Sequence, residues 1–241
     1  MQTKRIQGPQ RFPSYRFGMP RNVKMPLLGA IACLLALVPV AIAAYKIGPT
    51  VRLDRDILLR LVHTEGGPIE DAAEVIRLIG ELPVVIVLTG GIFWLGRHFG
   101  RRREALAAVA VVLGAGVSTQ LLKHVFAYPR FIDLYWTHQQ ELALPSGHTT
   151  AAAALSIALV LVVPPIYRAT AAAVGVLATG GVGISVVILG WHYPSDVIAG
   201  LLVAGAWGLA AVAYLRFMGD RDRALSASEA PRHHHLTVPT D

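Results

Sequence analysis

The chain has 241 residues, of which 54% are hydrophobic and 15% charged, and its mean hydropathy is +0.53. This composition is too apolar for an ordinary soluble domain and indicates a protein that is embedded in a lipid bilayer. The net charge of +7 does not indicate nucleic-acid binding, because the basic residues lie between apolar runs and not along one face. The single cysteine, Cys33, excludes a disulfide framework and a cysteine metal site.

Six apolar runs along the chain are candidates for membrane-spanning helices. The first follows six basic residues and has no small-residue cleavage site, so we expect a retained span and not a secretory signal. The second is the shortest and spans a bilayer only if Glu81 or Arg97 lies at an interface. The sequence therefore predicts an all-α, integral membrane bundle of six transmembrane helices. The runs cover residues 27–45, 83–95, 105–122, 149–163, 170–189 and 197–215.

The basic residues predict how this bundle is oriented. With six crossings, 15 of the 22 Lys and Arg residues lie on the side of the termini and seven on the other side. We expect a protein of the plasma (inner) membrane, and the positive-inside rule then places both of its termini in the cytoplasm. We expect a cytoplasmic basic segment at 1–26, the six-span domain at 27–217 and a flexible cytoplasmic tail at 218–241.

The longest connection on the outer side, residues 46–82, is amphipathic. Apolar residues such as Ile57, Leu58 and Leu61 lie among Arg and Asp residues at helical spacing. Two interpretations remain open: a helix that lies on the membrane surface and guides a lipid, or a solvated cap.

Polar residues gather at the expected outer ends of three spans. These segments read Lys-His-Val-Phe-Ala-Tyr-Pro-Arg-Phe at 123–131, Pro-Ser-Gly-His at 145–148 and Trp-His-Tyr-Pro-Ser-Asp at 191–196. Ionisable groups are costly at a membrane boundary unless they have a use. Because the topology brings all three segments to one face, we expect them to form one pocket.

The residue types in these segments suit a phosphate ester. Lys123 and Arg130 supply fixed positive charge, and the start of the helix after Ser146 and Gly147 supplies amides that bind anions. Of the two histidines, His148 and His192, one can attack phosphorus and the other can protonate the departing oxygen. Asp196, four residues after His192, can orient its ring.

Each of these residues also has a simpler interpretation. Alone, Lys123 is a membrane-interface anchor, Ser146 and Asp196 are helix caps, and Trp191 belongs to an aromatic belt. Two histidines and an aspartate could ligate zinc, but the neighbouring cations favour an anionic ligand instead. The conjunction of all these residues on one face favours a phosphate site.

These three segments resemble the signatures K-x6-R-P, P-S-G-H and S-R-x5-H-x3-D of the type 2 phosphatidic acid phosphatase superfamily, in order and spacing. The resemblance implies a helical membrane protein with an outward-facing site and no metal or other cofactor. It implies that His192 forms a phosphohistidine, that Asp196 supports His192, and that His148 is the general acid. The implied phosphate-binding residues are Lys123, Arg130, Ser146 and Gly147.

Two positions depart from the family pattern. Arg130 is followed by Phe131 where the family has proline, and Val186 stands where the family has arginine, although Ser185 fits. Loss of one charge-assisted phosphate contact is worth about 1.5 to 3 kcal/mol, or roughly 10- to 150-fold in rate. Arg77 and other arginines of the 46–82 connection are candidates to replace it, and the sequence does not place them.

The sequence thus favours an enzyme that acts on a membrane lipid phosphate or a polyprenyl diphosphate, with no nucleic-acid partner. A phosphotransferase would use the same histidine with an alcohol as acceptor. A catalytically weakened binding or scaffold protein is the alternative from another class, and Val186 is its only support. A transporter is disfavoured, because the ionisable residues gather at one end of the spans and not at their middle.

Overall fold

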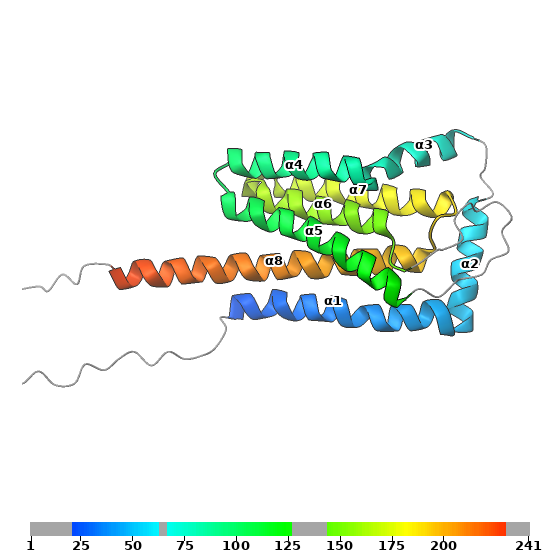
Figure 1. Cartoon of the computed structure of the whole chain (residues 1–241), viewed down its shortest axis with the longest axis horizontal. Coiled ribbons are helices and arrows are strands. Elements are labelled where there is room, and N and C mark those ends of the chain that lie inside the picture. The colour runs from blue at the N-terminus through cyan, green and yellow to red at the C-terminus, as the bar shows by residue number, and fades with distance from the viewer. Residues whose placement is uncertain (1–20, 63–66, 127–143, 230–241) are drawn as a thin grey trace, which may run out of the picture.

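The computed structural model describes residues 21–62, 67–126 and 144–229, and every regular element in these ranges is a helix (Figure 1). The all-α prediction is therefore confirmed. The elements are α1 (Arg21–Lys46), α2 (Gly48–Val62), α3 (Pro68–Arg77), η1 (Leu78–Gly80), α4 (Leu82–His98), α5 (Arg102–Val125), α6 (Gly147–Val162), η2 (Pro165–Tyr167), α7 (Arg168–Ile188) and α8 (Pro194–Glu229).

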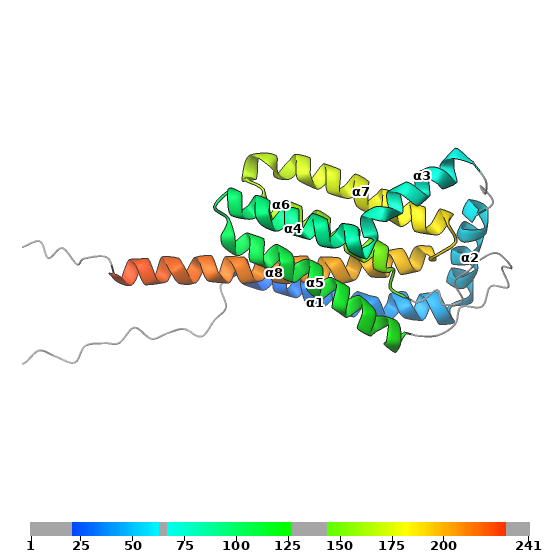
Figure 2. The same cartoon turned by 45° about the horizontal axis from the view of Figure 1, so that its top comes forward.

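The six apolar runs correspond to α1, α4, α5, α6, α7 and α8, which lie side by side as a bundle (Figures 1 and 2). In the described part of the chain, four helices are long and apolar enough to cross a membrane: α1, α5, α7 with η2, and α8. A fifth crossing is formed if α3, η1 and α4, which bend by 55°, act as one span. With 16 residues, α6 is about 24 Å long, which is less than the roughly 30 Å of a bilayer core. The chain is thus a helical membrane protein, and its six crossings stay a prediction.

Small side chains at the centre of the bundle allow its helices to approach closely. α6 is the central helix and contacts α4, α5, α7 and α8. Its buried residues include Ala154 and Ala158, and the neighbouring α5 and α8 contribute Ala108 and Val203. Such residues let helix backbones pack tightly in lipid, where van der Waals contact replaces the hydrophobic effect as the driving force.

The connection 46–82 forms α2, α3 and η1. α2 lies across one end of the bundle, at a steep angle to the other helices (Figure 1). Leu58 and Val62 of α2 are buried against Val187 and Tyr193, at the end of α7 and the start of the α7–α8 loop. This packing favours the cap over a helix that lies free on a membrane surface.

The opposite end of the bundle carries both ends of the described chain (Figure 1). α8 does not stop near Met218, where the flexible tail was expected, but continues to Glu229. Polar contacts with other helices explain the difference: Asn22 Nδ2 donates to Asp220 Oδ2 at 2.8 Å, and Arg103 forms an ion pair with Asp222. Residues 230–241, with the three histidines at 233–235, lie outside the described ranges.

Candidate active site

The loop between α7 and α8 carries the expected nucleophile. Gly190, with φ of +69°, ends α7, and this left-handed conformation is readily available only to glycine. The chain then turns back, so that the amides of Trp191 and His192 both donate to the Val186 carbonyl, at 2.9 and 3.1 Å. Pro194 begins α8 with the φ that its ring fixes. His192 is thereby held in a short loop between two helix ends.

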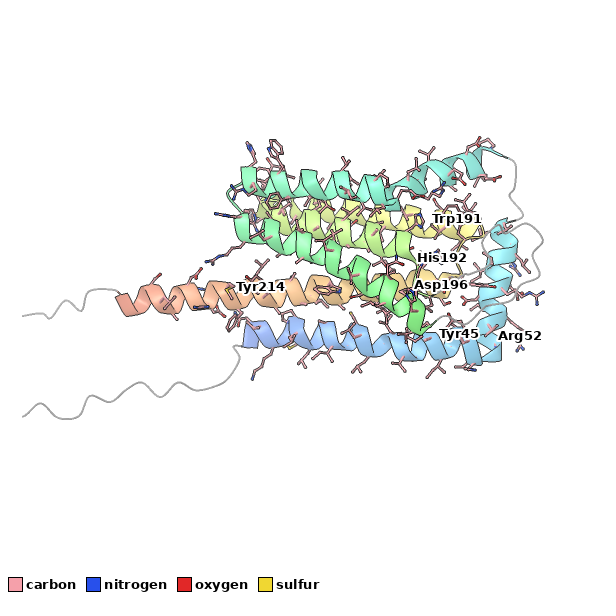
Figure 3. The ribbon with its side chains drawn as sticks, in the orientation of Figure 1. Tyr45, Arg52, Trp191, His192, Asp196 and Tyr214 are labelled. Atoms are coloured by element: carbon pink, nitrogen blue, oxygen red, sulfur yellow. The ribbon has the colours of Figure 1, made fainter. Side chains whose placement is uncertain are left out.

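His192 and Asp196 form a buried pair (Figure 3). The Nδ1 atom of His192 lies 3.3 Å from Oδ2 of Asp196, and the same oxygen accepts the Tyr193 amide at 3.0 Å. Asp196 is fully buried and His192 is 6% exposed. A carboxylate at Nδ1 favours the tautomer with its proton there, which leaves the Nε2 lone pair to act as a nucleophile.

The Pro-Ser-Gly-His segment meets this loop directly. The Ser146 amide donates to the backbone carbonyl of Asp196 at 2.9 Å. Ser146 caps α6: its Oγ accepts from the Thr149 amide at 3.4 Å and from the Thr149 hydroxyl at 3.1 Å. Gly200 permits this approach, since a Cβ there would lie 2.9 Å from the Ser146 carbonyl oxygen. The start of α6 and the start of α8 are therefore in contact.

His148 lies in the first turn of α6 and is half-buried. Its Nε2 atom is 3.5 Å from Oε1 of Glu81, just before α4. Its ring meets Trp191 edge-on, with 5.4 Å between ring centroids. The structure thus brings His148 to the residue next to His192.

Of the predicted phosphate-binding residues, Ser146 and Gly147 lie at this junction. Lys123 is half-buried in the last turn of α5, at the end of the bundle that α2 covers (Figure 1). Arg130 lies outside the described residues, so its place in the site stays a prediction. In the described part of the chain, His, Cys, Asp and Glu side chains form no group of three or more that could hold a metal ion.

Sequence reasoning missed three contributors to this site. Asp54 of α2 accepts the Ser195 amide at 3.2 Å and so ties the cap to the start of α8. Trp191, expected in an aromatic belt, instead lies between the His148 ring and the Arg77 guanidinium. Glu81, expected at a membrane interface, contacts both Arg77 and His148. The spacing of Glu74, Arg77 and Glu81 predicts ion pairs along one helix face, but no local signal joins them to His148.

An apolar groove of about 920 Å³ lies beside the site, between α7 and α8 and over α6. Val187 of α7 and Val197 of α8 line it close to the α7–α8 loop, and α2 contributes Ile57 and Leu61. Gly180, Gly205 and Gly208 widen it along its length. Its walls are almost entirely hydrocarbon.

Known proteins carry similar sequences over the part that holds the site. The sequence profile of the PAP2 superfamily matches residues 104–219. Phosphatidylglycerophosphatase B of Escherichia coli (strain K12) is 37% identical over 86 residues, which are 35% of this chain and 33% of that protein. Lipid A 1-phosphatase of Rhizobium etli is 30% identical over 125 residues, which are 51% of this chain and 52% of that protein. The matched part therefore spans a third to a half of the length of these relatives.

A solved structure shares the fold. The first transmembrane PAP2-type phosphatidylglycerolphosphate phosphatase from Bacillus subtilis superposes with a TM-score of 0.59 over 81% of this chain and 96% of that one, at 20% sequence identity. The matched profile includes all three polar segments, from Lys123 to Asp196. The part of the chain that carries the candidate site therefore matches the profile of the PAP2 superfamily.

Proposed function

We propose that the chain is a membrane phosphatase that hydrolyses a lipid phosphate or lipid diphosphate through a phosphohistidine at His192. One observation carries this proposal: a buried carboxylate, Asp196, holds the ring of His192 and through its own backbone holds the start of α6. A histidine oriented by a buried carboxylate, next to a helix N-terminus, is suited to nucleophilic attack on an anionic phosphorus centre.

The proposed reaction has two steps. In the first, the Nε2 lone pair of His192 forms a bond to phosphorus, the bond from phosphorus to the leaving oxygen breaks, and His148 gives that oxygen a proton. In the second, His148 takes a proton from water, the water oxygen attacks phosphorus, and the phosphorus–nitrogen bond breaks to release inorganic phosphate. Asp196 stabilises the positively charged ring between the two steps.

The phosphate oxygens need donors throughout this reaction. The amides of Gly147 and His148 belong to the first turn of α6, where backbone N–H groups lack helical partners. Lys123 and Arg130 add positive charge in the proposed site. No step requires a metal ion or another cofactor.

The apolar groove supports a lipid as the substrate. It begins at the residues that follow His192 and continues along α7 and α8, so a hydrocarbon chain in it would leave its phosphate at the catalytic loop. Two matched relatives are named for lipid phosphates, a phosphatidylglycerophosphatase and a lipid A phosphatase.

The distribution of charge supports an extracytoplasmic site. Both described chain ends lie at the end of the bundle opposite to α2 (Figure 1), and the basic residues concentrate on that side. By the positive-inside rule, the termini are then cytoplasmic and His192 faces the outer side of the plasma membrane.

Phosphate release by the purified full-length protein tests the proposal. We expect release in EDTA from at least one of polyprenyl diphosphate, phosphatidic acid and phosphatidylglycerol phosphate, and none from the His192→Ala variant. Transfer of the phosphoryl group to an added alcohol, in place of water, would identify a phosphotransferase. No release or transfer from any of these substrates would favour the scaffold protein and contradict the proposal.

A further inference from the structure

Arg77 is a cation at the active site that comes from outside the segment matched by the family profile. It is the last residue of α3, and its side chain is 17% exposed. Its guanidinium carbon lies 4.4 Å from the ring centroid of Trp191, the residue directly before His192. Stacking on an indole face is a favourable position for a guanidinium group and keeps its edge available for hydrogen bonds.

Two carboxylates orient Arg77. Its Nε atom donates to Oε2 of Glu74 at 2.5 Å, and Nη1 donates to Oε1 of Glu81. A guanidinium group has five N–H bonds, so three of them, including both on Nη2, have no hydrogen-bond partner in the described part of the chain. The two ion pairs thus fix the plane of the group and leave part of its edge for an anion.

The position of Arg77 relative to the two histidines is specific. Glu81 joins Arg77 to His148, since its Oε1 atom is the partner of both. The Trp191 ring, on which Arg77 stacks, also meets the His148 ring. Arg77 therefore lies on the His148 side of the site, and in the proposed reaction this is the side of the leaving oxygen.

We propose that Arg77 binds the leaving group and that this leaving group is itself a phosphate, so that the substrate is a lipid diphosphate. This inference rests on the proposed phosphohistidine chemistry. His192 attacks the terminal phosphorus, the bond from that phosphorus to the bridging oxygen breaks, and His148 protonates the bridging oxygen. The departing product is the lipid monophosphate, whose remaining oxygens accept hydrogen bonds from Nη1 and Nη2 of Arg77.

Charge explains why the arginine selects a diphosphate. Hydrolysis of a lipid monophosphate releases a neutral alcohol once His148 has protonated it. A fixed cation beside that alcohol therefore stabilises the leaving group very little. Hydrolysis of a diphosphate releases an anion, and the guanidinium group stabilises the charge that develops on it. Val186 stands where the family has arginine, whereas Arg77 supplies an arginine on the leaving-group side of the site.

The test compares two substrates with the same polyprenyl chain, one with a single phosphate and one with a diphosphate. For wild-type protein we expect kcat/KM to be higher for the diphosphate. Arg77→Met should lower kcat/KM for the diphosphate by at least about 10- to 150-fold, the range for loss of one of its two charge-assisted hydrogen bonds. It should leave kcat/KM for the monophosphate within about threefold. Arg77→Lys, which keeps the charge without the planar fork, should fall between.

Arg52→Met is the matched control, because Arg52 is an exposed arginine on α2 at the same end of the bundle (Figure 3). It should leave both substrates unaffected. If Arg77→Met does not fold, two other measurements test the proposal: the activity of Arg77→Lys and the inhibition of the wild-type protein. Pyrophosphate should inhibit the wild-type protein at least about 10-fold more strongly than inorganic phosphate does.

The outcomes separate this inference from the proposed function. An equal loss on both substrates in Arg77→Met, or no loss on the diphosphate, would overturn the role of Arg77 and leave the phosphohistidine intact. Equal inhibition by pyrophosphate and phosphate would have the same meaning. A wild-type protein that hydrolyses neither substrate, and in which His192 takes up no phosphate, would overturn the proposed function and the role of Arg77 with it.

Discussion

The backbone amide of Ser146 donates a hydrogen bond to the backbone carbonyl of Asp196 over 2.9 Å. This bond joins the first turns of α6 and α8, which are 50 positions apart in the sequence. One of these turns carries His148, and the other carries the carboxylate that holds His192. The relative placement of the two histidines therefore depends on contacts between backbones.

Asp196→Asn should reduce kcat far more than it reduces stability. The amide side chain can still accept the Tyr193 amide, but it cannot stabilise a positively charged His192 ring and favours the wrong tautomer. We expect kcat to fall by about 10²- to 10⁴-fold with a smaller change in KM. Steady-state kinetics and the amount of trapped phosphohistidine measure the effect. Activity near the wild-type level would show that the pair is structural only.

Asp54→Asn should weaken the contact between α2 and the start of α8. The carboxylate of Asp54 accepts the Ser195 amide, and a neutral acceptor makes a weaker hydrogen bond there. A loss of about 1 to 2 kcal/mol would lower kcat/KM by roughly 5- to 30-fold and speed hydrogen exchange of the Ser195 amide. Asp56→Asn is the control, since Asp56 is exposed on the same helix. Equal effects of the two substitutions would argue against a specific role for Asp54.

Gly80→Ala should displace His148. A Cβ at position 80 would lie 2.7 Å from the Cα of His148 and 2.9 Å from its carbonyl oxygen, so η1 or the start of α6 must move. Overpacking against a backbone costs about 1 to 3 kcal/mol, and we expect a lower melting temperature together with reduced kcat. Gly90→Ala in α4, where a Cβ meets nothing within 4 Å, provides the comparison and should melt no lower than wild type. A Gly80→Ala protein with unchanged kcat would contradict the close packing of η1 on α6.

Gly180→Phe should narrow the apolar groove and so select against long lipids. Gly180 lines the groove on α7, and a side chain there has open space to enter. We expect KM for a long-chain lipid phosphate to rise several-fold, about 1 kcal/mol or more of lost chain contact, with no change for a short-chain, water-soluble phosphate. Leu177→Phe, exposed on the same helix and outside the groove, should leave both values unchanged. A similar rise for both substrates in Gly180→Phe would indicate that the chain binds elsewhere.

Much of the helical framework could be predicted because its signal is local. Each apolar run that the sequence presents coincides with a helix to within one residue at its end, and the turn at Gly190 and the start of α8 at Pro194 follow from the conformations that these residues prefer. The continuation of α8 to Glu229 could not be predicted in this way. It depends on the pairing of Asp220 and Asp222 with residues of α1 and α5, and the local composition of that segment is polar.

By itself the sequence determined that the chain is a helical membrane protein and that His148, His192 and Asp196 stand at expected helix ends, because hydropathy and residue spacing act over short stretches of chain. Only the tertiary structure decided what surrounds them: Asp54 at the start of α8, Trp191 between Arg77 and His148, and Glu81 shared by those two residues. These contacts join α2, α3 and the residue before α4 to α6, α8 and the α7–α8 loop, more than 60 positions away, and such pairings form only when the helices pack.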